Sequence, residues 1–283
     1  MCCTIYFYIA KTMNDIHRTQ AIRDHWERDD LSPTILDALI ASGKNLDALT
    51  LDDLAPFDQF HGGGKGFTVR LARLANLKPG MSVLDVGGGL GGPARTLALE
   101  FGCQVKGVDL TESYIQAGKM LTSLMKLDEL VTFQVGDALD LPFDGASFDA
   151  VWTQNSGMNI ANKERLYTGF HRIIRPNGLL AIQEPMSGPN QPPIFPVMWS
   201  RDEANHFLRK PEQMRAVIEE AGFQTLKWDD VTLVKEASSN IRPVYSIQKL
   251  VMGEELLTEI TRASQRNEAE QRLLMFQAVF EKL

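Results

Sequence analysis

The sequence predicts an α/β fold in which a mostly parallel sheet carries helices on both faces. From residue 81 onward, short apolar runs typical of buried strands alternate with stretches typical of helices. The strand-like runs read "MSVLDV", "CQVKGVD", "VTFQV", "FDAVWT" and "GLLAIQE". Such alternation indicates parallel strands joined by right-handed crossover helices. The length of 283 residues and the hydrophobic fraction of 44% suffice for one large domain with its own core.

Helices are predicted before the first strand, over residues 14–54. Within them, Ser32 followed by Pro33 suits the N-cap and the first position of a helix, and Gly43 suits its end. Residues 55–66, "APFDQFHGGGKG", are predicted as a glycine-rich loop. The stretch "FTVRLARLANL" that follows has leucines at helical spacing.

The chain's start and its composition exclude several classes of partner. The apolar start "MCCTIYFYIA" lacks a basic region and a cleavage site and is too short to cross a membrane, so we expect residues 1–12 to be an extension before a start at Met13. The net charge is −7, and no Lys/Arg cluster of the kind that binds nucleic acid occurs. The cysteines, Cys2, Cys3 and Cys103, form neither a disulfide framework nor a metal-ligand spacing, which favours the cytoplasm. We expect no nucleic-acid, membrane or metal partner, and the sequence is compatible with a homo-oligomer.

A long proline-rich segment follows the fifth strand-like run. Its prolines forbid a regular helix or a central strand, and a loop of this length is typical of a lid; they are Pro185, Pro189, Pro192, Pro193 and Pro196. After it, "PEQMRAVIEEAG" is an amphipathic helix and "FQTLKWDDVT" is predicted as a sixth strand.

The chain is predicted to have four parts. Residues 1–56 form an N-terminal extension and helical cap, and residues 57–232 form the cofactor-binding core. Residues 233–270 are polar and mostly helical and are expected to be a lid insertion. Residues 271–283 contain "LLMFQAVF", an apolar run that suits a buried last strand completing the core sheet.

The stretch "VLDVGGGLGGPAR", residues 83–95, fits two cofactor motifs. Gly87, Gly89 and Gly92 have the G-x-G-x-x-G spacing of a dinucleotide-binding turn. Asp85 with Gly87, Gly89 and Gly91 has the D-x-G-x-G-x-G spacing that binds S-adenosylmethionine. The glycines serve either cofactor, because both need positive φ and a close backbone approach.

Asp85 distinguishes the two cofactors. A dinucleotide brings an anionic pyrophosphate to this turn, and a carboxylate at the end of the strand would repel it. S-adenosylmethionine carries a sulfonium and a protonated α-amino group instead. A carboxylate can accept hydrogen bonds from that ammonium and gains from the opposite charge. We therefore predict S-adenosylmethionine as the cofactor.

Further acids end the next two strand-like runs. Asp109, with Leu110 after it, suits the two ribose hydroxyls, a role that NAD sites share. Asp137 suits an adenine amino group while the N–H of Ala138 meets a ring nitrogen. Each acid alone is equally typical of a turn or a helix N-cap. Together they mark the carboxyl edge of the sheet, where ligands of such folds bind.

Four stretches resemble the successive motifs of class I S-adenosylmethionine-dependent methyltransferases. They are "VLDVGGGLGGPARTLA", "GVDLTESYIQAGK", "VGDALDLPFDGASFDAVWTQ" and "FHRIIRPNGLLAIQEP". The resemblance covers residues 57–232 and implies a Rossmann-like, seven-stranded sheet whose last strand is antiparallel. The segments "DQFHGGG" and "QNSGMNIANKERLY" resemble small-molecule methyltransferases near the sarcosine/dimethylglycine N-methyltransferases and related C-methyltransferases. Gly88 departs from the family pattern, in which many members carry Cys or Ser.

This resemblance implies transfer of a methyl group to a small-molecule acceptor, on nitrogen or carbon, by in-line displacement. Such a reaction depends mainly on alignment and exclusion of water, and a base is needed only if the acceptor must lose a proton. One alternative is a protein of this fold that binds the cofactor but catalyses another step, such as a cyclisation. Another is an NAD-dependent oxidoreductase.

Candidate groups beside the cofactor and the acceptor lie in three segments. Gln59 and His61 precede the glycine-rich loop; we assign Gln59 to the cofactor and His61 to catalysis as a base or polar anchor, although a loop histidine that caps a helix explains it equally well. Gln154 is assigned to the cofactor, at the end of the fourth strand. Residues assigned to the acceptor are Asn155, Met158, Trp199, Arg201 and His206. For this last set, core or lid packing and an exposed loop arginine are the plain alternatives.

Overall fold

The computed structural model describes residues 19–20, 22–234 and 246–283. The expected extension over residues 1–12, the start at Met13 and the pair Cys2 and Cys3 lie outside the described residues. Cys103 is buried as a free thiol.

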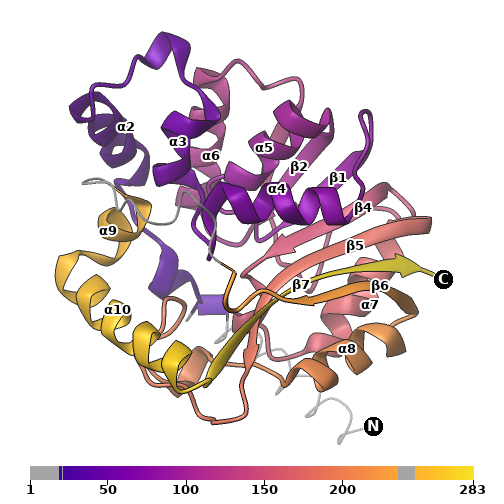
Figure 1. Cartoon of the computed structure of the whole chain (residues 1–283). Coiled ribbons are helices and arrows are strands. Elements are labelled where there is room, and N and C mark those ends of the chain that lie inside the picture. Colours follow the sequence, from indigo (N-terminus) through magenta and orange to yellow (C-terminus); the bar gives the residue numbers. More distant parts are fainter. Residues whose placement is uncertain (1–18, 21, 235–245) are drawn as a thin grey trace, which may run out of the picture.

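The centre of the fold is a seven-stranded sheet with the strand order β3-β2-β1-β4-β5-β7-β6 (Figure 1). Its strands are β1 (Ser82–Val86), β2 (Gln104–Asp109), β3 (Val131–Val135), β4 (Phe148–Gln154), β5 (Ile174–Ser187), β6 (Phe223–Asp230) and β7 (Leu273–Lys282). Strands β1 to β5 pair in parallel, and β7 runs antiparallel to β5 and β6. The predicted α/β class and the antiparallel last strand are confirmed. Because β1 lies between β2 and β4, the strand order reverses beside it, which is where open α/β sheets bind ligands.

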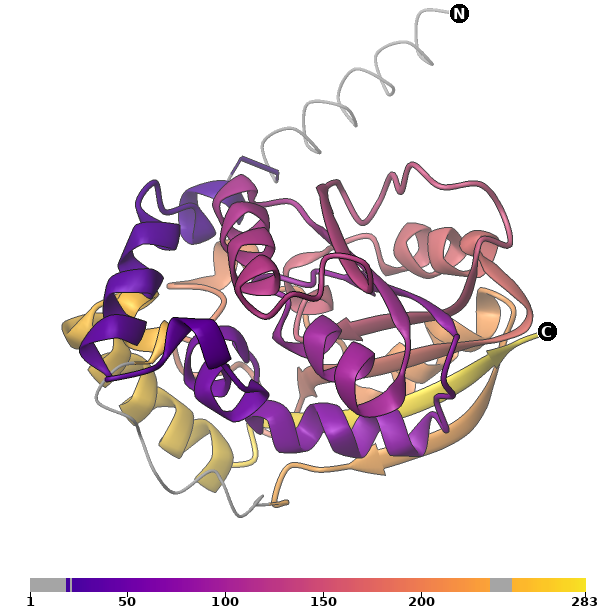
Figure 2. The same cartoon turned by 90° about the horizontal axis from the view of Figure 1, so that it is seen from above.

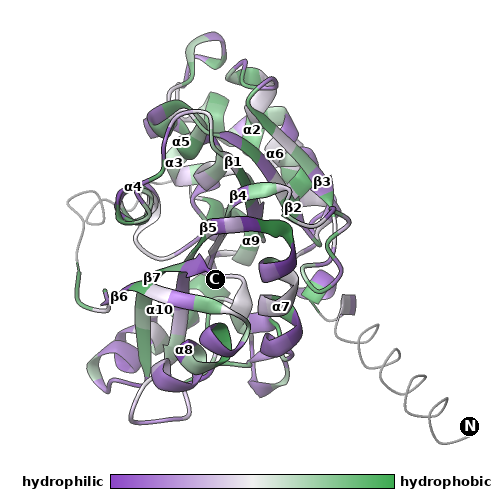
Figure 3. Cartoon of the chain, turned by 90° about the vertical axis from the view of Figure 1, so that its right-hand side faces the viewer, coloured by the Kyte–Doolittle hydropathy of each residue, from purple (hydrophilic) through white to green (hydrophobic). Residues whose placement is uncertain are grey.

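Helices cover both faces of the sheet, as predicted. One face packs against α4 (Gly64–Leu74), α5 (Gly92–Phe101) and α6 (Glu112–Leu124), and the other against α7 (Lys163–Ile173) and α8 (Pro211–Glu220) (Figure 1). The alternation of side chains along a strand feeds the two cores, so Val83 joins one core and Leu84 the other. Figure 3 shows hydrophobic stretches in the sheet and hydrophilic ones on outer helices such as α8 and α10.

Four helices form a cap at one end of the molecule: α2 (Leu31–Ala41), α3 (Leu51–Asp58), α9 (Ile247–Met252) and α10 (Glu254–Ala269). Figures 1 and 2 both show the first two, in indigo, beside the last two, in orange and yellow. Ile35, Phe57, Ile247 and Ile260 share one apolar cluster in the cap, and Tyr114 of α6 joins it. The helical prediction for 233–270 is therefore confirmed where that segment is described. The described part of the chain also contains the single-turn 3-10 helices η1 (Leu46–Ala48), η2 (Gly157–Asn159) and η3 (Glu203–Asn205).

The boundaries of the first helices differ from the prediction. Helix α2 begins at Leu31 with Asp30 as its N-cap, so Ser32 lies inside it. The earlier start buries Leu31 beside the later apolar residues of the same face. Gly43 follows the end of the helix with a φ of 70°, as predicted.

Two loop predictions also need correction. The glycine-rich loop is confined to residues 59–63, because α3 continues to Asp58 and α4 begins at Gly64. Strand β5 runs through Pro185 to Ser187. The proline is tolerated because β4 ends opposite Gln183, which leaves β7 as the single partner of β5 from that point on.

Candidate active site

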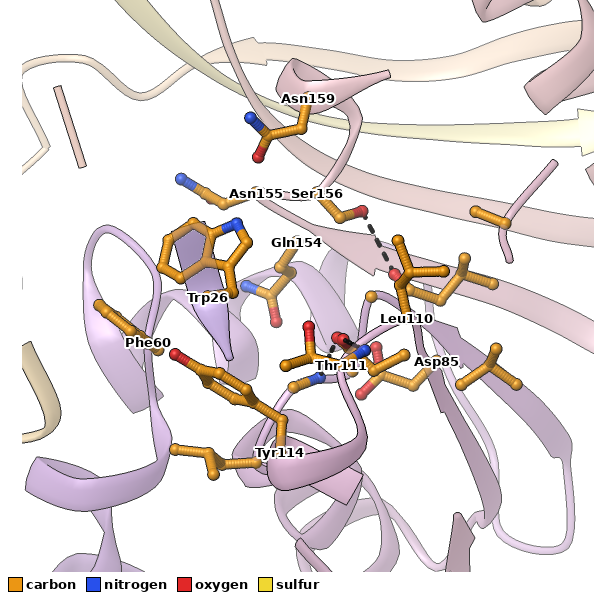
Figure 4. Close-up of a pocket in the computed structure, with 18 of the residues that line it drawn as sticks. Trp26, Phe60, Asp85, Leu110, Thr111, Tyr114, Gln154, Asn155, Ser156 and Asn159 are labelled. Carbon is orange, nitrogen blue, oxygen red and sulfur yellow. Dashed lines mark hydrogen bonds between the residues drawn. The ribbon is translucent and has the colours of Figure 1, made fainter. Parts of the chain in front are cut away.

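A pocket opens at the carboxyl ends of β1, β2, β3 and β4 and holds about 1020 Å³ of empty space including its mouth (Figure 4). The segments 22–26 and 58–61 close it from the opposite side. The structure brings these predicted residues to its wall: His61, Asp85, Gly87, Gly89, Asp109, Leu110, Asp137, Ala138, Gln154 and Asn155. Their roles in binding stay predictions.

The glycines of the turn are required by the packing of neighbouring side chains as well as by the approach of a ligand. Gly87 has a φ of 71°, and a Cβ there would lie 2.4 Å from Cβ of Ser156. Gly91 was predicted to bind the cofactor but does not line the pocket. It is the N-cap of α5, with a φ of 77°, and a Cβ there would lie 2.3 Å from the Phe133 ring. Gly91 therefore lets α5 pack closely on the sheet.

Asp85 carries an unpaired charge-bearing atom at the pocket. Its side chain is 1% exposed, and Oδ2 has no hydrogen-bond partner among the described residues. Burial, together with the nearby charge of Asp109, raises the pKa of Asp85 to about 7. A buried carboxylate without a donor is costly, and a ligand ammonium would satisfy it. A phosphate at this atom would add a second anion. Asp85 therefore fits S-adenosylmethionine and not a dinucleotide.

The next acids are held by backbone donors at the ends of their strands. Asp109 Oδ2 accepts from the N–H of Gly89 at 3.0 Å, and its Oδ1 accepts from the N–H of Thr111 at 2.9 Å. Burial raises the pKa of Asp109. Asp137 Oδ1 accepts from the N–H of Leu139 at 2.9 Å. Asp109 thus bridges the glycine turn and the start of α6 at the wall of the pocket.

Gln154, Gln183 and Gln277 face one another across β4, β5 and β7 and form a buried polar row. Gln183 Oε1 accepts from Gln154 Nε2 at 3.0 Å and from Gln277 Nε2 at 2.9 Å. Gln277 Oε1 accepts from Arg70, which also pairs with Asp229 at 2.7 Å. The row thus connects an ion pair on the outer strand β6 with the pocket.

Gln59 and His61 hold the loop between α3 and α4. Gln59 is buried and does not line the pocket: its Nε2 donates to Thr96 Oγ1 at 3.3 Å, and its Oε1 lies 2.9 Å from His61 Nε2. His61 Nδ1 lies 3.1 Å from the carbonyl oxygen of Gly62. Burial lowers the pKa of His61 to about 4, so the ring is neutral at neutral pH. The neutral ring has one N–H to donate, and its other nitrogen accepts, so one donated hydrogen bond supports an anchor for the loop.

Asn155 is the single member of the predicted acceptor set that reaches the pocket wall. Met158 and Trp199 are buried with Val197 in an apolar cluster that packs against Trp26 without lining the pocket, and His206 stacks on Trp199 with ring centroids 6.1 Å apart. Arg201 is exposed. Trp199, Arg201 and His206 were predicted at the site because the proline-rich segment was expected to be a lid, and Met158 because it follows the fourth strand. The segment instead packs beside η2, so its aromatic rings face one another.

Several pocket residues were missed by the sequence reasoning. Trp26 meets the rings of Phe60 and Tyr114 edge to face, with centroids 5.4 and 6.4 Å apart, and the three labelled side chains gather at one side of the pocket in Figure 4. Asn159 lies next to Asn155, farther from Phe60 than Trp26 is. Tyr114 follows Asp109 by five residues, in the first turn and a half of α6, a spacing that points back to the strand end. Trp26 carried no such signal.

Asp58, also missed, forms a buried ion pair behind the glycine turn. Its Oδ2 lies 2.9 Å from Arg95 Nη2, and both side chains are at most 1% exposed. Arg95 also donates to the carbonyl oxygen of Leu90 at 2.6 Å and to Thr122 Oγ1 at 2.9 Å. Burial raises the pKa of Asp58 to about 6, against the charge of Arg95. The pair ties α3 and α6 to the turn.

The strand order, the glycine turn and the acids at successive strand ends define an α/β domain of the nucleoside-cofactor type. Residues 84–182 match the family described as a methyltransferase domain. This central part of the chain is therefore a methyltransferase domain, and the predicted family resemblance is confirmed.

Named relatives agree with this family. A sterol methyltransferase-like protein 3 of Botryococcus braunii is 34% identical over 124 residues, which are 44% of this chain and 32% of that protein. Methyltransferase GfsG of Streptomyces halstedii is 25% identical over 219 residues, 75% of this chain and 77% of that protein. A sarcosine/dimethylglycine N-methyltransferase of Halorhodospira halochloris is 30% identical over 162 residues, 55% of this chain and 56% of that protein. The chain spans about a third of the length of several such relatives.

Solved structures share the fold. A geranyl diphosphate C-methyltransferase from Streptomyces coelicolor A3(2), in complex with Mg²⁺, geranyl-S-thiolodiphosphate and S-adenosyl-L-homocysteine, has a TM-score of 0.65 at 17% identity and covers 94% of this chain and 98% of its own. The cyclase SpnF has a TM-score of 0.65 at 19% identity and covers 89% of this chain and 93% of its own. Among the described residues, no helix is long and apolar enough to cross a membrane.

Proposed function

We propose that this chain transfers a methyl group from S-adenosylmethionine to a small-molecule acceptor, on nitrogen or carbon. The observation that carries the proposal is the unpaired, buried Oδ2 of Asp85 beside the glycine turn. A cationic amino-acid tail satisfies that atom, whereas a pyrophosphate does not. The methyltransferase domain over residues 84–182 supports the same cofactor.

Each cofactor group has a partner in the pocket. Asp85 and the turn at Gly87 hold the amino-acid tail, and Asp109 receives the ribose hydroxyls. Asp137 and the N–H of Ala138 face the adenine ring. All five positions line one continuous wall, at the ends of successive strands. The wall therefore presents carboxylates to hydroxyl, amino and ammonium groups, each of which is a hydrogen-bond donor.

The chain's contribution to the reaction is alignment in a site shielded from water. The cofactor supplies an electrophilic methyl group on its sulfonium. Trp26 and Phe60 close the pocket from the side facing the strand ends and hold the acceptor in line with that group. Such positioning alone supplies several kcal/mol, about 7 or more in favourable intramolecular cases. His61 anchors the loop that carries Phe60, and its predicted role as a base stays a prediction.

The chain's own residues also bear on the acceptor. A geranyl diphosphate C-methyltransferase of similar fold was solved in complex with Mg²⁺. The described residues of this chain contain no group of three or more His, Cys, Asp or Glu side chains that could hold a metal ion. We propose that the side chains lining the pocket select the acceptor.

A second candidate function uses the same fold for a cyclisation, with the cofactor as a bound structural element. The fold similarity to SpnF supports this candidate. Release of S-adenosylhomocysteine distinguishes the two, because a cyclase leaves the donor intact. An NAD-dependent oxidoreductase is disfavoured by Asp85.

The test follows the methyl group itself. The protein is incubated with S-adenosylmethionine bearing a trideuteromethyl group and with a panel of amines, phenols and prenyl-like acceptors, and products are analysed by mass spectrometry. We expect one product that carries the trideuteromethyl group, with an equal amount of S-adenosylhomocysteine. Conversion of an acceptor without consumption of the donor would instead support the cyclase. A cytoplasmic location and a homo-oligomer stay predictions; light scattering during size-exclusion chromatography measures the second.

A further inference from the structure

We infer that the acceptor enters the pocket through a non-anionic, largely apolar part that bears a hydroxyl or an amine. This inference rests on the proposed function and names its substrate class. It follows from the charge, the aromatic wall and the free hydrogen-bonding atoms at the acceptor end. That end is the part of the pocket outside the strand-end acids, lined by Ile22, Trp26, Phe60, His61, Asn159 and Ile160, with Asn155 at its border.

The pocket offers no positive charge to an anion. Among the described residues that line it, the charged side chains are the carboxylates Asp58, Asp85, Asp109 and Asp137, and no Lys or Arg is present. His61 adds no charge, because burial keeps its ring neutral at neutral pH. An anionic group placed here would lose its hydration without gaining a counter-charge from the protein, which costs several kcal/mol when S-adenosylhomocysteine, which has no sulfonium, is bound.

Two buried cations behind the pocket wall are already committed to protein partners. Arg95 is fully buried and pairs with Asp58. Lys163 is also fully buried, and its Nζ donates to the carbonyl oxygens of Gly157, and of Ile160 at 2.7 Å. Neither side chain lines the pocket. They stabilise its walls and leave the interior to the aspartates and the aromatic rings.

The acceptor end is mostly apolar. Trp26 lies between Phe60 and the asparagines in Figure 4, and it contacts Phe60 edge to face. Ile22 and Ile160 add aliphatic surface. Such a wall gains free energy by removing apolar ligand surface from water and gives nothing to a carboxylate or a phosphate.

The orientation of the Asn155 amide is fixed by its neighbours. Gln183 lies 2.8 Å from the carbonyl oxygen of Gly62, so the atom of Gln183 that makes this contact is Nε2, a donor. The same Nε2 lies 3.0 Å from Asn155, so the atom of Asn155 facing it is the acceptor Oδ1. Asn155 Nδ2 is therefore turned away from Gln183, and it has no hydrogen-bond partner among the described residues. In Figure 4 this nitrogen points over Trp26.

Asn159 is fixed in the opposite sense. Its Nδ2 lies 3.0 Å from the carbonyl oxygen of Trp199 and 2.9 Å from that of Asn205, which only a donor can do. Its Oδ1 is therefore a free acceptor, and in Figure 4 it points toward Asn155. A hydroxyl or an amine can serve both a donor and an acceptor. Carboxylates and phosphates only accept, and Asn159 Oδ1 would repel them.

The test uses two dyes of nearly the same shape on the protein saturated with S-adenosylhomocysteine. Phenylnaphthylamine is neutral and carries one N–H, and anilinonaphthalene sulfonate adds a sulfonate to the same skeleton. We expect the neutral dye to bind at least about tenfold more tightly. Trp26→Ala and Asn159→Leu should each weaken its binding, about tenfold for the tryptophan. Trp228→Ala, at a tryptophan on β6 outside the pocket, is the matched control and should leave it unchanged.

Two results would overturn the inference. One is binding of the sulfonate dye as tight as that of the neutral dye and equally sensitive to Trp26→Ala. The other is binding of the neutral dye that neither pocket variant alters. Binding of S-adenosylhomocysteine is measured first, by calorimetry on the same sample. Its absence would contradict the proposed function, whereas its presence with an anion preference would contradict the substrate class alone.

Discussion

Gln183 holds Asn155 at two points, one on the main chain and one on the side chain. The N–H of Asn155 donates to the carbonyl oxygen of Gln183 at 2.8 Å, and Gln183 Nε2 donates to Asn155 Oδ1 at 3.0 Å. Asn155 is in the left-handed region with a φ of 53°, a conformation that asparagine tolerates better than most residues. The polar row thus ends in a fixed amide at the border between cofactor and acceptor.

Gln183→Leu should weaken recognition of the acceptor while sparing the cofactor. The substitution removes the side-chain hydrogen bonds of Gln183 with Asn155 and the Gly62 carbonyl, and also those from Gln154 and Gln277, but it leaves Asp85 and Asp109 untouched. We expect kcat/KM for the acceptor to fall about 10- to 100-fold, a range typical of lost supporting interactions. The Kd of S-adenosylhomocysteine should change less than about threefold.

The control for this variant is Tyr167→Phe. Tyr167 is buried against α8 on the opposite face of the sheet, where its hydroxyl lies 3.5 Å from Met214 Sδ. The Tyr167→Phe substitution removes a buried polar group at a distance from the pocket, so it tests whether lost stability alone changes kcat/KM. Equal losses of kcat/KM in the two variants would refute a specific role for Gln183.

Cofactor affinity should depend on pH through Asp85. The pKa of Asp85 in the free protein is raised to about 7, so below that pH the carboxyl must lose a proton before it can pair with an ammonium. The affinity for S-adenosylhomocysteine should therefore rise as pH increases from about 5 to 7, by up to about tenfold per unit, and level off above. Calorimetry across this range measures it, and Asp85→Asn should flatten the profile. An affinity independent of pH in the unaltered protein would contradict the assignment.

The carboxyl group of Asp85 should also make the free energy of unfolding depend on pH. Because the folded pKa of Asp85 lies above its ordinary value of 3.8, its ionisation opposes folding. The free energy of unfolding of the ligand-free protein therefore falls as pH rises from about 4 toward 7. Denaturant unfolding of the ligand-free protein should show a smaller fall in the free energy of unfolding over this window for Asp85→Asn. If the free energy of unfolding of Asp85→Asn fell as much as that of the unaltered protein, the pH dependence would come from another residue.

Arg95→Met should destabilise the protein by about 3 kcal/mol or more, since it leaves the Asp58 carboxylate buried without its partner. The double variant Asp58→Asn with Arg95→Met should recover part of this loss, because no uncompensated charge is left. The free energy of unfolding in denaturant gives both values. The ion-pair account would be contradicted if the double variant lost more free energy of unfolding than the two single variants lose when their losses are added.

The variant His61→Ala distinguishes two roles of His61, as an anchor of the loop and as a general base. If His61 ties the loop through its contacts with Gln59 and Gly62, turnover should fall less than about tenfold, and the pH profile should keep its shape. Loss of a general base typically lowers kcat by about 100-fold or more and removes its titration from the profile. The pH dependence of kcat in both proteins decides. The larger loss with an altered profile would restore the predicted catalytic role.

The sheet could be predicted from the sequence because alternating strands and helices leave a local signal. The antiparallel last strand came from the family resemblance. The start of α2 was missed because the burial of Leu31 depends on partners far along the chain. Pro185 was misassigned for a similar reason: proline in a strand is excluded only where both neighbours need its N–H, and β4 has already ended there.

At the site, the strand-end acids were predictable because parallel strands deliver their ends to one edge. The acceptor end was not, since Trp26 precedes α2 and carries no motif, and Phe60, although it lies within "DQFHGGG", has no polar group that marks it as a site residue. Met158, Trp199 and His206 have the composition of a binding pocket, yet they pack with one another and do not line the pocket. Composition therefore identified segments rich in aromatic and apolar side chains but not the direction in which those side chains face.

The most direct test of the central claim is a calorimetric titration of the protein at about pH 7.5 with S-adenosylhomocysteine, repeated with NADH and with Asp85→Ala. The account predicts one-to-one binding of S-adenosylhomocysteine, no binding of NADH, and a severe loss of affinity in the variant, because the buried Oδ2 of Asp85 is the partner of the ligand ammonium. Tight binding of NADH without S-adenosylhomocysteine, or an affinity unchanged by Asp85→Ala, would contradict it.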